Sequence, residues 1–385
     1  MEGRELIYLD NAATSFPKPF EVIEAVNNFM AYEGGNAGRG GHPLAMAAAG
    51  RIFECREKLA RFFDAAGADR VCFTENTTYA LNICIKGLLK RGDHVLISDM
   101  EHNAVYRPLY RMKSQGMIEL DVFPTMIFDR CRSAERICAA VAKMIKRNTR
   151  MLVCTGASNI TSAPMPIREL GALCRRLGIL FVVDGAQSAG HIRTSVKDMR
   201  IDALCIPGHK GLLGPQGCGA LILGEEIRPN TLIEGGNGVD SLEGAMSREI
   251  PERYEAGTLP APAIVGLSEG IDVIDKLGID RVRRHEKSLF NRTREGLCTI
   301  GGVEIYTPEY EGPVLLFNLR KKSSEETARL LAERGICVRG GYHCAALGHK
   351  TMGTENGGAV RVSFGPFNGT SDVDALCDAI KHILK

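Results

Sequence analysis

Between about residues 70 and 225 the chain alternates short apolar runs with longer segments of helical periodicity, and this pattern restricts the possible folds most strongly. Several runs are rich in Val, Ile and Leu without polar alternation, which indicates strands buried on both faces of a parallel sheet. The expected strands cover residues 70–74, 94–98, 119–123, 151–155, 180–184, 203–206 and 219–223, and the helices between them cover 77–90, 106–115, 134–146 and 167–177. Such repetition predicts a doubly wound α/β domain that binds ligands at the carboxyl ends of its strands.

A second, smaller domain is expected as well, because 385 residues exceed what one ordinary core accommodates. Near residue 228 the composition changes, and Gly- and Pro-rich segments precede a helical pattern at 263–277. In the remaining C-terminal part we expect strands at 314–319 and 337–339, a helix at 324–333 and a final helix from residue 371. We therefore predict a large, mainly parallel sheet domain over residues 21–255 and a small α+β domain formed by 1–20 and 256–385.

The overall composition excludes several classes of partner. The net charge of +2 gives no electrostatic reason to expect binding to nucleic acid or to an anionic membrane. The N-terminus lacks the apolar stretch of a signal peptide, and no run approaches the roughly 20 apolar residues that cross a bilayer. The 13 cysteines are scattered, without Cys-x-x-Cys or zinc spacing, so we expect reduced thiols, no metal site and a cytoplasmic location.

Two charged side chains follow the ends of expected strands. Lys210 lies in Gly208-His209-Lys210, where a partly desolvated amine has a lowered pKa and can form a Schiff base with an aldehyde cofactor. Asp184 ends another apolar strand, and a buried carboxylate needs a cationic partner such as a protonated pyridine nitrogen. In isolation, an aspartate before glycine is more often a turn or cap residue.

Hydroxyl, imidazole and amide groups follow further strands. Thr77 and Thr78 open a helix whose free N–H groups suit a phosphate, although in isolation such a segment is more often an ordinary threonine N-cap. His102 can lie over a flat ring or be an exposed loop histidine, and the Asn159 amide can bond a phenolic oxygen. Because the carboxyl ends of the strands share one edge, we expect these groups to face one cleft.

The loop from Arg339 to Ala345 adds a thiol, Cys344, to this set. We expect Arg339 and His343 to be cationic neighbours that favour the thiolate of Cys344. The Gly-rich stretch that follows is expected to be a flexible lid. A lysine for an aldehyde cofactor and a nucleophilic thiol indicate an enzyme that removes sulfur from an amino acid.

Taken in order, the motifs resemble the fold-type I, class V aminotransferase-like enzymes that use pyridoxal 5′-phosphate, and most closely the cysteine desulfurases and selenocysteine lyases. The resemblance extends over essentially the whole chain. It rests on Leu9-Asp10-Asn11-Ala12-Ala13-Thr14, Asn36-Ala37-Gly38-Arg39-Gly40-Gly41-His42, Thr77-Thr78, His102, Asn159, Asp184-Gly185-Ala186-Gln187, Gly208-His209-Lys210, Glu255-Ala256-Gly257-Thr258, the cysteine loop and Ala359-Val360-Arg361-Val362-Ser363.

The resemblance implies a role for each cofactor residue. Lys210 would be the Schiff-base lysine and the group that moves the α-proton, and Asp184 would pair with the pyridine nitrogen. The other implied cofactor contacts are His102 stacked on the ring, Gln187 and Asn159 at the ring oxygen, and Thr77, Thr78 and His209 at the phosphate. Thr258, with Gly235 and Gly236, would reach the phosphate of a neighbouring subunit, which implies a homodimer.

The resemblance also implies the substrate contacts. Arg361 would bind the substrate carboxylate, with Asn11, Ala12 and Arg339 beside it. Cys344 would attack the sulfur of the bound amino acid, keep it as a persulfide and release alanine. The expected partners are therefore L-cysteine or L-selenocysteine, a second copy of the chain and a sulfur-acceptor protein.

Three departures indicate a divergent branch that is similar to the SUF-type enzymes. Pro207 replaces a phosphate-binding serine, Gly38 replaces the histidine of an Asn-x-His-Arg-Gly segment, and Tyr342 replaces the first histidine of His-His-Cys. We expect a cysteine desulfurase, with selenocysteine lyase as the nearest alternative. A third interpretation is a class V transaminase or another β-lyase, and such an enzyme would not need Cys344. A non-catalytic scaffold has no use for Lys210, Asp184 or Arg361.

Overall fold

The large domain is built on a seven-stranded sheet in the computed structural model, which describes residues 6–38, 40–308 and 312–385. The strands in spatial order are β2 (Val71–Thr74), β8 (Gly219–Leu223), β7 (Ala203–Pro207), β6 (Leu180–Asp184), β5 (Thr149–Thr155), β3 (His94–Ser98) and β4 (Glu119–Phe123). The neighbours from β7 to β4 are parallel, whereas β8 is antiparallel to both β2 and β7. The expected mainly parallel sheet is confirmed, with one reversed strand.

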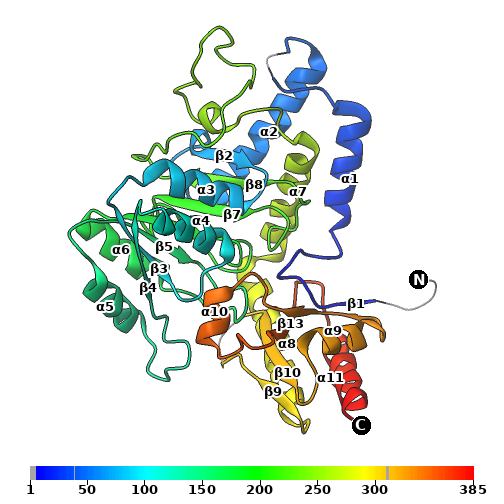
Figure 1. The fold of residues 1–385 in the computed structure, drawn as a ribbon. Coiled ribbons are helices and arrows are strands. Elements are labelled where there is room, and N and C mark those ends of the chain that lie inside the picture. Colours follow the sequence, from blue (N-terminus) through cyan, green and yellow to red (C-terminus); the bar gives the residue numbers. More distant parts are fainter. Residues whose placement is uncertain (1–5, 39, 309–311) are drawn as a thin grey trace.

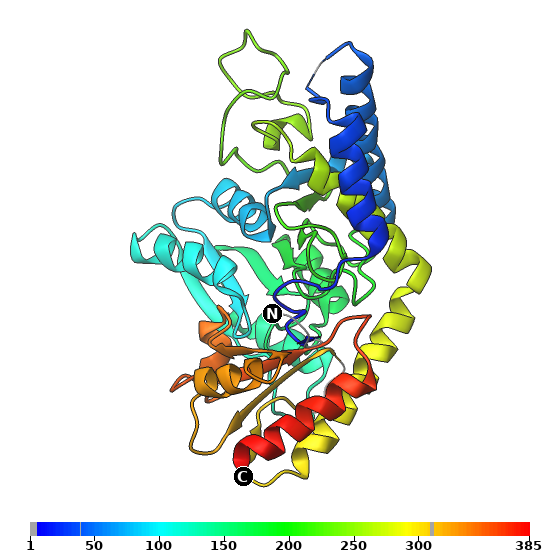
Figure 2. The ribbon, with the colours of Figure 1, turned by 90° about the vertical axis from the view of Figure 1, so that its right-hand side faces the viewer.

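Helices cover both faces of this sheet, as Figures 1 and 2 show. Leu, Ile and Val side chains alternate between two cores because successive strand residues point to opposite faces. One core is completed by α3 (Thr77–Leu88) and α4 (Asn103–Ser114). The helices that complete the other core are α2 (Pro43–Phe62), α5 (Ala134–Met144), α6 (Ile167–Leu177) and α7 (Ala261–Leu277). Helix α1 (Phe20–Asn28) packs beside α7, and the π-helix Phe29–Glu33 follows it.

The small domain is centred on an antiparallel sheet in the order β12 (Arg339–Gly341), β13 (Ala359–Ser363), β10 (Val314–Leu319) and β9 (Val303–Ile305). Its core includes side chains of α8 (Ile279–Cys298) and α11 (Thr370–Leu384), and α9 (Ser324–Ala332) contributes Leu331. Strand β1 (Ile7–Tyr8) pairs in parallel with β11 (Ile336–Cys337), so the N-terminal segment joins the C-terminal part of the chain (Figure 1). On the basis of this pairing we propose that the N-terminal segment belongs to the small domain, as the sequence suggests. Helix α7, which the sequence assigns to the small domain, packs in the core of the large domain instead, so we place the second boundary after residue 277 and not at 256.

Two local expectations are corrected by the structure. The single strand expected at 337–339 is two short strands, β11 and β12, because the chain leaves one sheet at residue 337 and enters another at 339. The stretch expected to be a flexible lid contains helix α10 (Ala346–Thr351), which lies against the large domain. None of the helices in the described ranges combines the length and the apolar character that a membrane-spanning segment requires.

Candidate active site

A cavity lies at the carboxyl ends of β5, β6 and β7, next to the start of α3. Its lining residues are Asn76, Thr77, Thr78, His102, Ala104, Thr155, Asn159, Asp184, Ala186, Gln187, Pro207, His209 and Lys210. The fold thus brings together every proposed cofactor contact except Thr258. The carboxyl ends of parallel strands share one edge of a sheet, which is why Asn76 and Lys210, 134 positions apart in sequence, meet here.

Lys210 and Asp184 are the two ionisable groups at the centre of this cavity. Desolvation lowers the pKa of Lys210 to about 8, and the charge of Asp184 acts in the opposite direction. Asp184 is 2% exposed, and its Oδ1 accepts a hydrogen bond of 2.9 Å from the backbone N–H of Ala186. Burial raises the pKa of Asp184, because a buried carboxylate is unfavourable without a cationic partner.

His102 is the N-cap residue of α4, and its Nδ1 accepts a hydrogen bond of 3.0 Å from the backbone N–H of Ala104. Burial, together with the charges of Lys210 and Arg361, lowers the pKa of His102 to about 4. The ring is therefore neutral at neutral pH. Because Nδ1 accepts a hydrogen bond, the single ring proton resides on Nε2.

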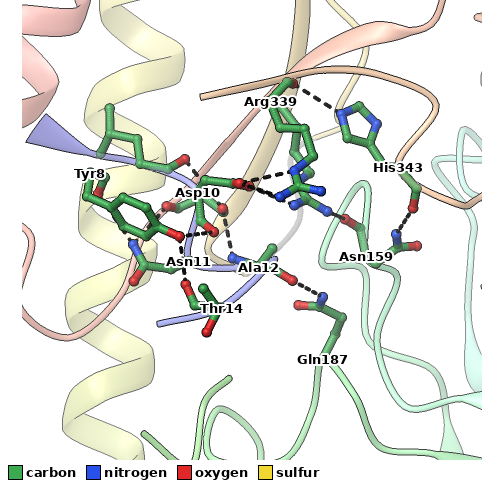
Figure 3. A network of polar contacts seen from close by, with 12 residues as sticks. Tyr8, Asp10, Asn11, Ala12, Thr14, Asn159, Gln187, Arg339 and His343 are labelled. Atoms are coloured by element: carbon green, nitrogen blue, oxygen red, sulfur yellow. Dashed lines mark hydrogen bonds and ion pairs between the residues drawn. The ribbon is translucent and has the colours of Figure 1, made fainter. Parts of the chain in front are cut away.

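Two arginines from the small domain share the carboxylate of Asp10, and Figure 3 labels Asp10 and one of them, Arg339. Arg361 is 3% exposed, and its Nη2 lies 2.8 Å from Asp10 Oδ1. Arg339 binds the second oxygen of Asp10 through Nη2 at 2.9 Å and Nε at 3.0 Å. Arg361 also donates from Nη1 to the backbone carbonyl of Asn159 at 3.2 Å. One carboxylate thus faces two guanidinium groups, which leaves an excess positive charge for an anionic ligand.

The segment around Asn11 connects this pair to the large domain. Gln187 donates from Nε2 to the backbone carbonyl of Ala12 at 2.9 Å (Figure 3). The backbone N–H of Ala12 donates to Ser363 Oγ at 2.9 Å, and Asn11 Nδ2 donates to the carbonyl of Ser363 at 3.2 Å. Asn11 and Ala12 therefore lie between β13, which carries Arg361, and the cavity.

The cysteine loop rests on the rim of the same cavity. Asn159 Nδ2 donates to the backbone carbonyl of His343 at 2.8 Å (Figure 3). The backbone N–H of Asn103 donates to the carbonyl of Cys344 at 2.7 Å. Cys344 is an exposed residue. Two consecutive carbonyls thus attach the loop to the residues that line or adjoin the cavity.

The expectation that His343 is a cationic neighbour of Cys344 is wrong. Burial and the charge of Arg361 lower the pKa of His343 to about 3, so its imidazole is neutral at neutral pH. The remaining cation of the loop, Arg339, is already paired with Asp10. The sequence places a histidine beside the cysteine but does not reveal that the loop is packed against a buried guanidinium.

Thr258 lies away from the cavity that holds Lys210. It is exposed and lines a separate cleft together with Gly236, Asn237 and Phe53. The contact with a second subunit that the sequence suggests stays a prediction. Arg39, part of the motif at residues 36–42, lies outside the described residues.

Comparison with known proteins identifies the family. The aminotransferase class-V family model matches residues 7–376. The chain belongs to this family. A probable cysteine desulfurase of Methanothermobacter thermautotrophicus is 31% identical, and the match covers 99% of this chain and 95% of the relative. A probable cysteine desulfurase of Pyrococcus abyssi is 32% identical over the same shares.

Solved structures of cysteine desulfurases have the same fold. The apo cysteine desulfurase of Thermococcus onnurineus superposes with a TM-score of 0.88 at 30% identity, covering 98% of this chain and 94% of that one. The Escherichia coli cysteine desulfurase CsdA gives a TM-score of 0.86 at 27% identity with the same coverage. The class V aminotransferase fold expected from the sequence is confirmed.

Class V aminotransferases use pyridoxal 5′-phosphate, and the cavity offers the polar atoms that this cofactor requires. Thr77 Oγ1, Asn159 Oδ1 and His209 Nδ1 are buried and have no hydrogen-bond partner within the described part of the chain. Buried polar atoms are normally paired, so these three indicate a polar ligand. Thr77 begins α3, where backbone N–H groups suit a phosphate. The donor set therefore fits the cofactor.

Sequence reasoning missed a lysine that supports the Lys210 turn of this class V aminotransferase. Lys18 Nζ donates to the backbone carbonyl of His209 at 3.0 Å and to Ser15 Oγ at 2.7 Å. The same carbonyl accepts from the backbone N–H of Ser15 at 3.0 Å and from Thr14 Oγ1 at 3.1 Å. Burial lowers the pKa of Lys18 to about 8. The only sequence signal is its place shortly after the motif from Leu9 to Thr14.

A second group that sequence reasoning missed is Glu101, next to His102. Its side chain is fully buried; Oε1 accepts hydrogen bonds from Ser98 Oγ and, at 2.8 Å, from the backbone N–H of Thr155. Burial raises the pKa of Glu101 to about 8, and the charge of Asp184 adds to the increase. A polar loop in the sequence gives no sign that this carboxyl is enclosed behind the cavity.

Proposed function

We propose that this protein is a pyridoxal-phosphate-dependent cysteine desulfurase, which converts L-cysteine to L-alanine and transfers the sulfur to Cys344. The observation that carries the proposal is the attachment of the cysteine loop to the cavity of Lys210 and Asp184. Asn103 and Asn159 hold the carbonyls of Cys344 and His343 at 2.7 and 2.8 Å. A class V aminotransferase that acted without a protein thiol would not need this arrangement.

The cofactor residues differ in the part of the cofactor that each would contact. Lys210 would bind the cofactor aldehyde, and Asp184 would pair with its ring nitrogen. Thr77, Thr78 and His209 would hold the phosphate, with His102 over the ring and Gln187 and Asn159 at the ring oxygen. The bound cofactor supplies an electron sink that stabilises negative charge on the substrate. Pro207 contributes neither a hydroxyl nor an N–H group, so Thr77 and His209, whose buried atoms are unpaired, are the strongest phosphate ligands in the described residues.

The substrate carboxylate would bind Arg361, with Arg339, Asn11 and Ala12 beside it. The buried Nε of Arg361 has no partner among the described residues, so one face of the guanidinium is free for a ligand. Lys210, with its pKa near 8, can both accept and donate a proton close to neutral pH. It would take the α-proton of the substrate.

Sulfur transfer follows from the position of Cys344. As a thiolate, its Sγ attacks the substrate sulfur, an S–S bond forms and the Cβ–S bond breaks. The electron pair of that bond stays on the substrate, which takes up a proton at Cβ, regains one at Cα from Lys210 and leaves as alanine. Cys344 keeps the sulfur as a persulfide. Because Cys344 is exposed, a second thiol can collect the sulfur from it, and we propose a separate acceptor protein for this step.

The experiment is to measure alanine and sulfide from L-cysteine, and selenide from L-selenocysteine, with dithiothreitol present. The variants are Cys344→Ala and, as a matched control, Cys298→Ala, which removes another exposed thiol. We expect Cys344→Ala alone to abolish turnover of cysteine while the cofactor absorbance stays. Full activity of Cys344→Ala on cysteine would overturn the proposal. Poor turnover of cysteine by the unaltered protein, with rapid release of selenide, would assign a selenocysteine lyase instead.

We also propose a homodimer in which Thr258, Gly235 and Gly236 reach the second subunit's phosphate. Two exposed apolar side chains line the cleft that Thr258 lines, with Met30 58% and Phe53 54% exposed. Such a cluster is typical of a covered surface. Sedimentation analysis should give a dimer that Phe53→Lys weakens. Phe367→Lys, at a side chain that is 47% exposed elsewhere, should leave it intact. A monomeric unaltered protein would contradict the proposal.

The thiol state is consistent with a reducing compartment. All 13 cysteines are free. Reduced cysteines are the rule in the cytoplasm, where thiol systems prevent disulfide formation. We therefore propose a cytoplasmic location, which fractionation of cells that produce the protein would test.

A further inference from the structure

His349 lies in helix α10 and contacts both residues that precede Cys344. Its Nε2 is 3.2 Å from His343 Nδ1, and the two rings are stacked with centroids 5.4 Å apart. Tyr342 meets the His349 ring edge-on at 5.6 Å. On its far side, His349 Nδ1 is 2.7 Å from Thr354 Oγ1. The imidazole is 1% exposed, so it is held between the cysteine loop and the segment after α10.

The partners of this pair define its protonation state. His343 Nε2 lies 3.2 Å from the backbone carbonyl of Arg339, which only accepts, so Nε2 carries the proton. Because His343 is neutral, its Nδ1 is an acceptor. His349 must therefore donate from Nε2, and its Nδ1 accepts from the Thr354 hydroxyl. Burial lowers the pKa of His349 as well, in agreement with a neutral ring. The hydrogen bonds run in one direction, from Thr354 through His349 and His343 to Arg339.

The loop that this series of hydrogen bonds supports has an unfavourable backbone. His343 has φ 50° and Cys344 has φ 54°. Two consecutive residues other than glycine rarely adopt this left-handed backbone conformation. Such a conformation persists only where the surroundings fix it. The carbonyl contacts from Asn159 and Asn103 fix one side of the loop. His349 is the side-chain partner that fixes the other.

Helix α10 can serve this purpose because it is itself anchored. A Cβ atom on Gly348 would lie 2.7 Å from Ile160 Cδ1 and 3.5 Å from Met100 Sδ, so the helix packs closely on the large domain. Ala345 and Met352, at either end of α10, belong to the same buried cluster. The position of His349 is thereby tied to the domain that forms the cavity.

We propose that His349 is a positioning residue for Cys344. Its donated hydrogen bond fixes the His343 ring, and with it the left-handed turn that presents the thiol to the cavity. The inference rests on the proposed function for its effect on turnover, because only there is Cys344 the sulfur acceptor. Its effect on the loop itself does not depend on that function.

The test compares His349→Gln with His349→Leu. Glutamine keeps an N–H donor toward His343, whereas leucine keeps only the bulk. Thr354→Val removes the hydroxyl behind His349, and His382→Leu, at an exposed histidine in the last turn of α11, is the control. Two experiments use the cofactor-loaded protein. One is hydrogen–deuterium exchange of the Asn103 amide, which bonds the Cys344 carbonyl, and the other is steady-state kinetics that give kcat and KM for L-cysteine.

We expect His349→Leu to accelerate exchange at Asn103 and to lower kcat roughly tenfold, the effect of losing one ordinary hydrogen bond. KM should stay unchanged, because the Arg361 contacts are intact. Thr354→Val should give a smaller change in the same direction, and His349→Gln should restore the exchange rate at Asn103 and kcat. His382→Leu should match the unaltered protein in both measurements.

Unchanged exchange in His349→Leu would overturn the inference, whatever its activity. Equal losses in the Gln and Leu variants would overturn it too, because ring shape and not the hydrogen bond would then matter. If Cys344→Ala retained full turnover, the proposed function would fail, yet exchange at Asn103 would still decide whether His349 positions the loop. The two failures are thus separable.

Discussion

Asp10 Oδ1 lies 2.8 Å from Nη2 of Arg361, and the other oxygen of Asp10 binds Arg339. The guanidinium proposed to bind substrate is therefore held in place before any substrate arrives. Its Nη1 is occupied by the Asn159 carbonyl, and its Nε remains unpaired. A group that is oriented in advance loses little conformational freedom when a carboxylate binds.

Arg361→Lys should raise KM for L-cysteine. Lysine keeps the charge but loses the planar donor pattern, and a charge-assisted hydrogen bond is worth about 1.5–3 kcal/mol. We expect KM to increase roughly 10- to 100-fold, with a smaller change in kcat, in steady-state assays. Arg320→Lys, at an exposed arginine after β10, is the control. An unchanged KM would show that the substrate carboxylate binds elsewhere.

The rate at which the cofactor-free protein takes up pyridoxal phosphate should depend on the pKa of Lys210, which burial lowers to about 8. Only the unprotonated amine reacts. The rate should therefore rise about tenfold per pH unit below pH 8 and level off above it, whereas an ordinary lysine would continue to rise toward pH 10.4. Stopped-flow absorbance measures this rate.

Lys18 is the control for this profile, because burial also lowers its pKa to about 8. Lys18→Met should keep the dependence on pH, and Lys210→Ala should abolish covalent attachment. A profile of Lys18→Met that no longer levels off near pH 8 would assign the titration to Lys18 instead.

The strands were predictable from the sequence because they are buried on both faces. Every residue of β3 and β7 is buried, and apolar runs of this kind have few other uses. The antiparallel direction of β8 was not predictable, because an apolar run indicates a buried strand but not whether it pairs in parallel or antiparallel. The helix in the expected lid was missed because glycines suggest mobility, whereas Gly348 is there to allow close packing.

The candidate site was predictable as a set of residues but not in its charges. Lys210, Asp184 and His102 follow strand ends, and the strand order brings them together. The neutrality of His343 depends on burial beside Arg361, two residues that the sequence separates by 18 positions. Protonation states, and the contact of Lys18 with the Lys210 turn, arise from tertiary packing that no local pattern encodes.

Glu101→Gln should change how stability depends on pH. Burial raises the pKa of Glu101 from its ordinary 4.5 to about 8, so between these values the folded protein binds a proton that the unfolded chain releases. Stability of the unaltered protein therefore falls as pH rises through this range. The neutral variant lacks this contribution.

Chemical unfolding at pH 5 and pH 8 tests this prediction. At each pH the unfolding free energy of the unaltered protein is subtracted from that of Glu101→Gln. This difference should be more favourable to the variant at pH 8 than at pH 5, by about 1–3 kcal/mol after allowance for structural relaxation. The exposed Glu57→Gln serves as the control and should show no such difference. Parallel pH curves for Glu101→Gln and the unaltered protein would mean that Glu101 stays ionised in the folded state.

Arg56→Met should destabilise the large domain strongly, because it leaves Glu255 buried without its cation. Arg56 Nη1 lies 2.7 Å from Glu255 Oε1, Nη2 lies 3.0 Å from Oε2, and both side chains are less than a tenth exposed. Removing one partner of a buried ion pair costs about 3–5 kcal/mol. Arg51→Met, which breaks ion pairs of a partly exposed arginine on the same helix, should cost less than about 1 kcal/mol.

The loss in Arg56→Met should also depend on pH, because Arg56 opposes the burial that raises the pKa of Glu255. Without the arginine, the folded-state pKa of Glu255 rises further above 4.5, and the carboxyl is protonated more readily in the folded protein. The destabilisation should therefore be larger at pH 8 than at pH 5, as measured by urea unfolding. Replacing Glu255 by Gln as well should recover part of the loss, since the double variant buries no charge. Equal costs for Arg56→Met and Arg51→Met would mean that water reaches Glu255 and that the ion pair is not the element that joins α2 to the segment before α7.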